Sequence, residues 1–140
     1  MHTMRKRIYY YDTDAEGVVY YGNYMRFLEE ARTSFIEDLG FSLKELSKNG
    51  YIFAIKRQEI EYKYPIYYGE IIEIKTSVEE ITPYRIRFYY EIYNSENKKT
   101  TVARTDMVCI SPEFHIKEMP QELIQKVKDK CESKREKFYL

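Results

Sequence analysis

Apolar residues recur along this chain with two different periods, and the change of period separates predicted helices from predicted strands. Between positions 24 and 39 they return every three or four residues, the spacing of a helix with one buried face. The buried face is predicted to comprise Tyr24, Leu28, Ala31 and Phe35. Asn23 is the predicted N-cap of this helix, and Gly40 marks its predicted end.

Two further helices are expected. A short one fits residues 43–48, with Ser42 as its cap and Asn49 and Gly50 as its terminator. A charged amphipathic helix is expected after Pro120 and extends to about Lys134.

Most of the remaining chain is typical of strands. Apolar and polar residues alternate with period two over 72–78 and 85–92, so each of these strands has one covered face and one wetter face. The other strands are expected at 5–10, 51–64 and 101–111. One strand, a long helix and four strands with short connections predict an α+β fold, an antiparallel sheet wrapped around helix 24–39.

One helix is too small to cover so long a sheet, so edge pairing between two copies of the chain is expected to form a homodimer. Pairing of two such dimers into a tetramer stays open. The sequence contains no internal repeat and no linker, so one domain spanning residues 1–140 is predicted.

Charge and composition exclude several function classes. The chain has 23 basic and 23 acidic residues, a balance that argues against nucleic-acid binding through phosphate neutralisation. The apolar runs are too short for a membrane span, and no apolar segment follows the basic start as in a signal peptide. A soluble, cytoplasmic protein is therefore expected.

The inventory of reactive residues is small. The two histidines are expected in a frayed terminus (His2) and on the surface (His115), and the two cysteines form no C-x-x-C pair. The five glycines lie too far apart for a nucleotide loop. No metal site and no cofactor is therefore predicted, and any catalysis is expected to use carboxylates and backbone dipoles.

A dense motif, YDTDAEGVVYYGNY, occupies residues 11–24. Its Asp-x-Asp-Ala, Gly-Val-Val-Tyr and Asn-Tyr elements stand at the spacing of the 4-hydroxybenzoyl-CoA thioesterase family, which this segment closely resembles. It is most similar to the short-chain acyl-CoA thioesterases associated with the bacterial Tol–Pal cell-envelope system. The resemblance implies the hot-dog fold, a homodimer with active sites at the subunit interface, and metal-free hydrolysis of acyl-CoA thioesters.

The resemblance also implies roles for particular residues. Asp14 corresponds to the catalytic carboxylate, the backbone N–H of Tyr21 to the oxyanion contact, and Glu29 to a supporting acidic residue of the helix. Substrate contacts are expected at Gly17, Val18, Asn23 and Tyr24 in the motif, at Ala54 and Ile55 beside the acyl group, and at Arg85 and Arg87 for the CoA phosphates.

The chemistry is consistent with these roles, because a thioester carbonyl gains negative charge during attack and a helix N-terminus is electropositive. Asp14 can act as nucleophile or as general base, and both roles fit the sequence. The acyl group is expected to be a short or medium chain, with aromatic groups also open. The alternatives are a dehydratase, whose usual His–carboxylate pair the motif lacks, and a non-catalytic module that binds acyl-CoA or a partner protein.

Overall fold

The computed structural model describes the backbone of residues 1–139 and the side chains of residues 1–131; the end of the predicted domain, Leu140, lies outside the described residues. In chain order the elements are β1 (His2–Arg7), the 3₁₀ turn η1 (Tyr10–Asp12), α1 (Tyr21–Asp38), α2 (Leu43–Lys48), β2 (Ile52–Tyr62), β3 (Ile71–Ile81), β4 (Arg85–Tyr93), β5 (Lys99–Ile110) and α3 (Gln121–Tyr139). None of the described helices is long and apolar enough to span a bilayer.

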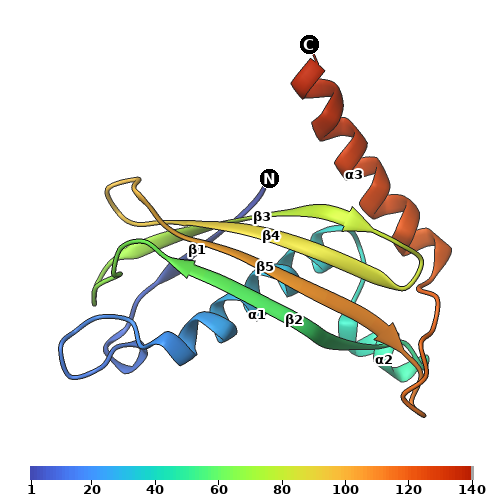
Figure 1. The fold of residues 1–140 in the computed structure, drawn as a ribbon, viewed down its shortest axis with the longest axis horizontal. Helices are drawn as coiled ribbons and strands as arrows, with labels where there is room; N and C mark the ends of the chain where they lie inside the picture. Colours follow the sequence, from blue (N-terminus) through green and yellow to red (C-terminus); the bar gives the residue numbers. More distant parts are fainter. Residues whose placement is uncertain (140) are drawn as a thin grey trace.

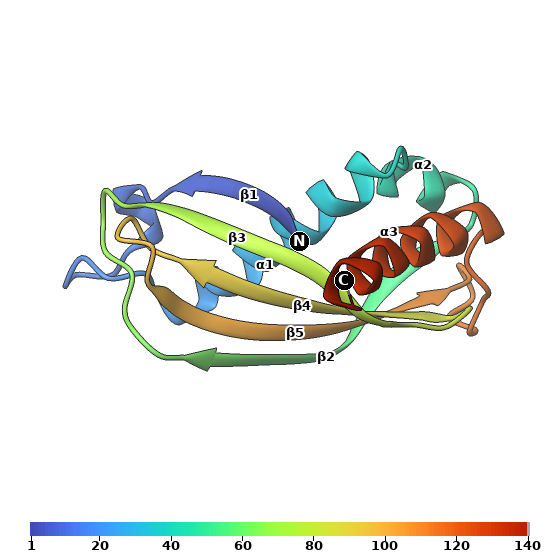
Figure 2. The same ribbon diagram turned by 90° about the horizontal axis from the view of Figure 1, so that it is seen from above.

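The five strands form one antiparallel sheet in the order β1-β3-β4-β5-β2. The sheet curls around α1, which lies along its inner face, while α3 packs at the end of β3 and then leads away (Figures 1 and 2). Strands β1 and β2 are the two edges. The predicted α+β fold with a sheet wrapped around one long helix is confirmed.

The core lies between the apolar face of α1 and the inner face of the sheet. Along β4, Ile86, Phe88, Tyr90 and Ile92 are fully buried, whereas the alternate residues are half-buried. The predicted apolar face of α1 packs onto them, with the Phe35 ring edge-on to Phe88 at 5.8 Å between centroids. The period-two pattern of β4 therefore predicted its inner face correctly.

The predicted start of the long helix was wrong by three residues. Helix α1 begins at Tyr21, and its N-cap is Tyr20 in an extended conformation, not Asn23. Asn23 lies inside the first turn, where its amide donates to the carbonyl oxygen of Asp12 at 2.7 Å. This tertiary contact outweighs the capping preference of asparagine. The predicted end is confirmed, since the helix stops at Asp38 and Gly40 follows with a φ of +93°.

The first strand also differs from the prediction, because it spans His2–Arg7 and not residues 5–10. His2 is therefore not in a frayed terminus. It pairs with Thr76 in the sheet, and its ring Nε2 lies 2.6 Å from a carboxylate oxygen of Asp38. After Arg7 the chain leaves the strand and turns at η1.

Candidate active site

The loop of residues 13–20, called the motif loop below, is held in place by Asp12, whose side chain is completely buried. One carboxylate oxygen accepts from the backbone N–H of Tyr9 at 2.9 Å, and the other forms an ion pair with Arg26 of α1. The carbonyl oxygen of Asp12 also accepts from the N–H of Tyr20 at 3.2 Å. A single buried residue thus ties η1 and the loop to the first two turns of the helix.

Asp14 projects from a tight turn in this loop. Its Oδ1 accepts from the N–H of Glu16 at 2.8 Å, and its carbonyl oxygen accepts from the N–H of Gly17 at 3.0 Å. Gly17 has a φ of +79°, a conformation that glycine adopts most easily. The side chain of Asp14 is exposed, and its Oδ2 accepts no hydrogen bond from the described residues. This oxygen is therefore available to a ligand.

The first turn of α1 is uncapped. No side chain accepts from it, and within the described residues the N–H groups of Tyr21 and Gly22 have no acceptor. Free N–H groups at a helix start carry about half a positive charge, which suits an oxyanion. Gly22 leaves room for the ring of Tyr20, because a Cβ at this position would lie only 2.8 Å from that ring.

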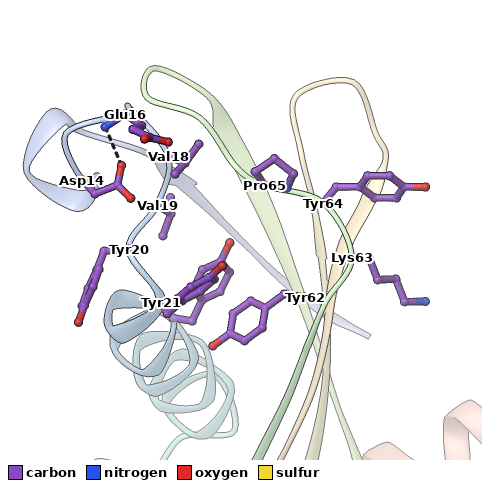
Figure 3. Close-up of a pocket in the computed structure, with 11 residues that line it drawn as sticks. Asp14, Glu16, Val18, Val19, Tyr20, Tyr21, Tyr62, Lys63, Tyr64 and Pro65 are labelled. Atoms are coloured by element: carbon purple, nitrogen blue, oxygen red, sulfur yellow. Dashed lines mark hydrogen bonds between the residues drawn. The ribbon is translucent and has the colours of Figure 1, made fainter.

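Asp14 and this helix start open on one pocket of about 430 Å³. Asp14, Val19 and Tyr21 lie on one side and Tyr62 on the other, while the side chains of Lys63 and Tyr64 point away (Figure 3). The complete lining is Asp14, Glu16, Val18, Val19, Tyr20, Tyr21, Tyr24, Tyr62, Lys63, Tyr64 and Pro65. The volume lies within the usual range for small-molecule sites.

Tyrosine rings form the inner wall of the pocket. The ring of Tyr62 lies 5.0 Å from that of Tyr21 and 4.9 Å from that of Tyr24, edge-on to the latter. Burial raises the pKa of Tyr24 to about 12 and also raises the pKa of Tyr62. Both phenols are therefore neutral near pH 7 and can donate hydrogen bonds within the pocket.

The structure brings together part of the predicted site. Asp14, Val18, Tyr21 and Tyr24 line the pocket. Gly17 and Asn23 are absent from the lining and instead shape the loop and the helix start. Glu29 is an exposed residue of α1 two turns further along the helix, also outside the lining.

Four predicted contacts lie at the other end of the sheet within one chain. Ala54 and Ile55 are near the start of β2, whereas Tyr62 ends it. At 3.3 Å per residue, Ile55 and Tyr62 are about 23 Å apart. Arg85 and Arg87 are near the start of β4 and engage acidic neighbours. Arg85 lies 2.5 Å from Glu80, and Arg87 lies 2.7 Å from Asp106.

Sequence reasoning did not identify the far wall of the pocket, residues 62–65. These residues belong to the predicted strand 51–64 and to the proline that ends it. Their role depends on the pairing of Tyr62 with Thr101, which brings the end of β2 beside the start of α1. The only local signal was the cluster of two tyrosines and a proline at the strand end.

Comparison with known proteins identifies the family. A family model described as the thioesterase-like superfamily matches residues 9–127. The chain belongs to this superfamily. It is 33% identical over 115 residues to YneP of Bacillus subtilis, an alignment that covers 81% of this chain and 83% of YneP. It is 34% identical over 106 residues to the acyl-CoA thioester hydrolase YbgC of Escherichia coli O6:H1, covering 76% of this chain and 79% of YbgC.

Solved structures agree with this membership of the thioesterase-like superfamily. The structure of a DHNA-CoA thioesterase from Staphylococcus aureus matches with a TM-score of 0.85 and 31% identity, covering 91% of this chain and 90% of that one. The resemblance predicted from residues 11–24 and the hot-dog fold are therefore confirmed.

Proposed function

We propose that this protein is an acyl-CoA thioester hydrolase that uses Asp14 and the backbone N–H of Tyr21. The observation that carries the proposal is that Asp14 and the uncapped start of α1 open on the same pocket. The names of YbgC and of the Staphylococcus aureus thioesterase support the reaction class. No histidine lines the described pocket, which favours hydrolysis over a dehydratase that pairs histidine with a carboxylate.

The proposed reaction needs few groups. The thioester carbonyl oxygen accepts from the N–H of Tyr21, so the charge that develops during attack meets the positive end of α1. Asp14 then either attacks the carbonyl carbon and forms an anhydride that water cleaves, or removes a proton from the water that attacks. In both routes the C–S bond breaks and CoA leaves as its thiolate.

The size and lining of the pocket favour a short or flat acyl group. Its volume of about 430 Å³ and its wall of Tyr21, Tyr24 and Tyr62 suit short to medium aliphatic chains and aromatic rings. The neutral phenol of Tyr24 offers a hydrogen bond to a polar substituent of an aromatic ring. We propose these two acyl classes as substrates.

The functional unit is proposed to be a homodimer of single-domain chains in the cytoplasm, paired through the β2 edges. Strand β2 is eleven residues long and forms one edge of the sheet. Two residues of this strand, Ile55 and Tyr62, are 44% and 43% exposed. Antiparallel pairing of two β2 strands brings Ala54 and Ile55 of one chain towards Tyr62 of the other, so the predicted acyl contacts would come from the second chain. A tetramer of such dimers stays a prediction.

The catalytic role of Asp14 is tested by Asp14→Asn, with release of free thiol measured from acetyl-, hexanoyl-, palmitoyl-, benzoyl- and 4-hydroxybenzoyl-CoA. We expect the rate to fall by at least about 100-fold with CoA binding retained. Glu37→Gln, an exposed change on the far side of α1, is the control. Unchanged turnover in Asp14→Asn contradicts the role of Asp14, and a wild-type protein that binds CoA without turnover favours the binding module.

The role of the Tyr21 N–H is tested by Tyr21→Pro. Proline is well tolerated at the first helical position, and the extended Tyr20 before it is compatible with a following proline. The matched control is Tyr21→Ala, which also removes the ring but keeps the N–H. We expect Tyr21→Pro to be slower than Tyr21→Ala by about 100-fold, the usual effect of one oxyanion donor. Equal rates would exclude this N–H from the reaction.

A further inference from the structure

The two flanks of α1 face opposite edges of the sheet. On one flank, Glu30 forms an ion pair at 3.0 Å with Lys6 of β1. Successive residues of a helix are turned by about 100°, so Arg32 lies almost opposite Glu30, on the flank from which Tyr21 contacts Tyr62 of β2. Glu29 precedes Arg32 by three residues and is its neighbour on the helix surface.

Arg32 reaches the inner side of the sheet, beside Tyr90 of β4. Its Nη1 atom is buried and has no hydrogen-bond partner among the described residues, and none of their carboxylates pairs with it. Arginine keeps its charge in proteins, so an unpaired buried guanidinium nitrogen is costly. Among the described residues, Arg32 therefore lacks a counter-ion.

The polar groups around Arg32 are already engaged with each other. Tyr90 donates its hydroxyl to Thr105 at 3.0 Å, and Thr105 donates to the amide oxygen of Gln58 at 2.8 Å. Burial raises the pKa of Tyr90, while the hydrogen bond with Thr105 and the charge and hydrogen bonding of Arg32 lower it, so the guanidinium lies at the Tyr90 hydroxyl, a neutral group that leaves its charge uncompensated. Tyr90, Thr105 and Gln58 belong to β4, β5 and the middle of β2, so this chain of hydrogen bonds leads from Arg32 towards the open edge of the sheet.

Glu29 carries the complementary charge. It is exposed and forms no ion pair or hydrogen bond with the described side chains. Met25, one turn earlier on the same flank, is 48% exposed. A two-fold axis through the middle of paired β2 strands makes the two α1 helices antiparallel. If Arg32 of one chain then meets Glu29 of the other, the reverse contact forms as well.

We propose that Arg32 of each chain forms an ion pair with Glu29 of a second copy of the chain, across a two-fold axis beside the middle of β2. This inference rests on the dimer proposed above. The pair is self-complementary, and it supplies the half-buried Arg32 with a carboxylate that the described residues of its own chain do not provide. It also sets the register of the two β2 strands, because a shifted register would separate both pairs.

Two charge reversals test the pair by sedimentation velocity and native mass spectrometry. Glu29→Arg leaves two positive charges on this flank, and Arg32→Glu leaves two negative charges. We expect each variant alone to dimerise on the order of 100-fold more weakly than the wild type. Glu37→Arg, an exposed change on the far side of the same helix, is the control and is expected to dimerise normally.

An equimolar mixture of the two variants is the decisive measurement. In a mixed dimer both contacts again join opposite charges, whereas within each chain the like charges remain. We expect the mixture to form heterodimers with near wild-type affinity. Single variants that dimerise like the wild type, a mixture that stays monomeric, or a monomeric wild type would each overturn the pair. None of these outcomes decides whether Asp14 acts in hydrolysis, which thiol release measures separately.

A milder change tests the same pair without altering the half-buried Arg32. Glu29→Gln alters only an exposed side chain, so its fold is expected to remain intact, as checked by circular dichroism. We expect its dimer dissociation constant to rise about tenfold. An unchanged constant would overturn the proposed pair.

Discussion

Helix α1 carries two arginines six residues apart whose surroundings differ. Arg26 forms an ion pair with Asp12, a carboxylate that is completely buried and that belongs to the same chain. Arg32 has a buried nitrogen without any partner among the described residues. The first arginine closes the motif loop over the start of the helix, while the second lies at an edge that a single chain leaves open.

The two arginines mark a part of the molecule whose bonds are completed within one chain and a part whose bonds are not. The loop that presents Asp14, the helix start and the tyrosine wall are all assembled from bonds within the chain. The β2 edge and the flank of α1 beside it keep unpaired backbone groups, exposed apolar side chains and, as far as the structure describes the chain, a charge without a counter-ion. We infer that catalytic geometry is built within each chain and that the acyl end of the site is completed by pairing.

The largest effect is expected from Asp12→Ala. The change leaves Arg26 and the N–H of Tyr9 without their acceptor and opens a small cavity, so the free energy of unfolding should fall by about 3 kcal/mol. Thiol release should be lost as well, because the loop no longer holds Asp14 at the pocket. Urea denaturation and the thiol assay provide the two measurements.

Asp12→Asn is the matched control for this change. Its amide oxygen can still accept from Tyr9, so we expect a smaller loss of stability than in Asp12→Ala. Should Asp12→Ala prove as stable as the wild type, the intrachain pair would not be what holds the loop.

A second prediction compares Arg26→Gln with Arg32→Gln directly. Each variant should lower the melting temperature, but for different reasons. Loss of a bond within one chain weakens the folded chain itself, with a cost of about 2 kcal/mol. Loss of a bond between chains acts through association, so its effect should grow on dilution over a roughly hundredfold range of protein concentration.

Differential scanning calorimetry at several concentrations makes this comparison. For Arg26→Gln, the melting curve should shift equally at all concentrations relative to the wild type. The opposite pattern, a concentration-dependent shift in Arg26→Gln and a constant one in Arg32→Gln, would reverse the assignment of the two arginines.

The sequence predicted those parts of the molecule that depend on local periodicity. The buried face of α1 from Tyr24 to Phe35 and the alternating strand β4 both follow from apolar spacing. The motif located Asp14 and Tyr21, which do line one pocket. Local pattern is sufficient here because each signal is repeated over several turns or strand residues.

The parts that sequence missed depend on contacts between distant segments. Helix α1 starts at Tyr21 because Asp12 receives the side chain of Asn23, a bond that spans eleven positions. Tyr62 faces the helix start only through the register of β2 against β5. The position of Arg32 beside Tyr90 likewise depends on the packing of α1 against β4, two elements that lie far apart in the sequence.

A smaller effect is expected from Gly22→Ala, which alters the start of α1, a part of the site built within one chain. The added Cβ would lie 2.8 Å from the Tyr20 ring, so this pocket residue must move. Alanine gains about 1 kcal/mol of helix propensity, which should offset the crowding and leave stability nearly unchanged. Thiol release should fall by roughly fivefold, which corresponds to a barrier about 1 kcal/mol higher. Full activity would mean that the position of Tyr20 is unimportant.

The smallest effect is expected from Asp106→Asn, on the outer face of the sheet. Hydrogen bonds from Arg87, together with its charge, hold the pKa of Asp106 below its usual value. A carboxylate with a depressed folded-state pKa stabilises the fold above its unfolded pKa of about 3.9, and this contribution disappears as the pH falls through the folded value. The wild type should therefore exceed Asp106→Asn in stability at neutral pH by no more than about 1 kcal/mol.

The pH dependence and the concentration dependence together identify this pair as an intrachain one. The difference between wild type and Asp106→Asn should shrink steadily below about pH 4, measured by urea denaturation at fixed pH. It should be the same at low and high protein concentration, as for Arg26 and unlike Arg32, because both partners belong to one chain. A difference that grows in acid, or that depends on concentration, would mean that Asp106 has a partner other than Arg87.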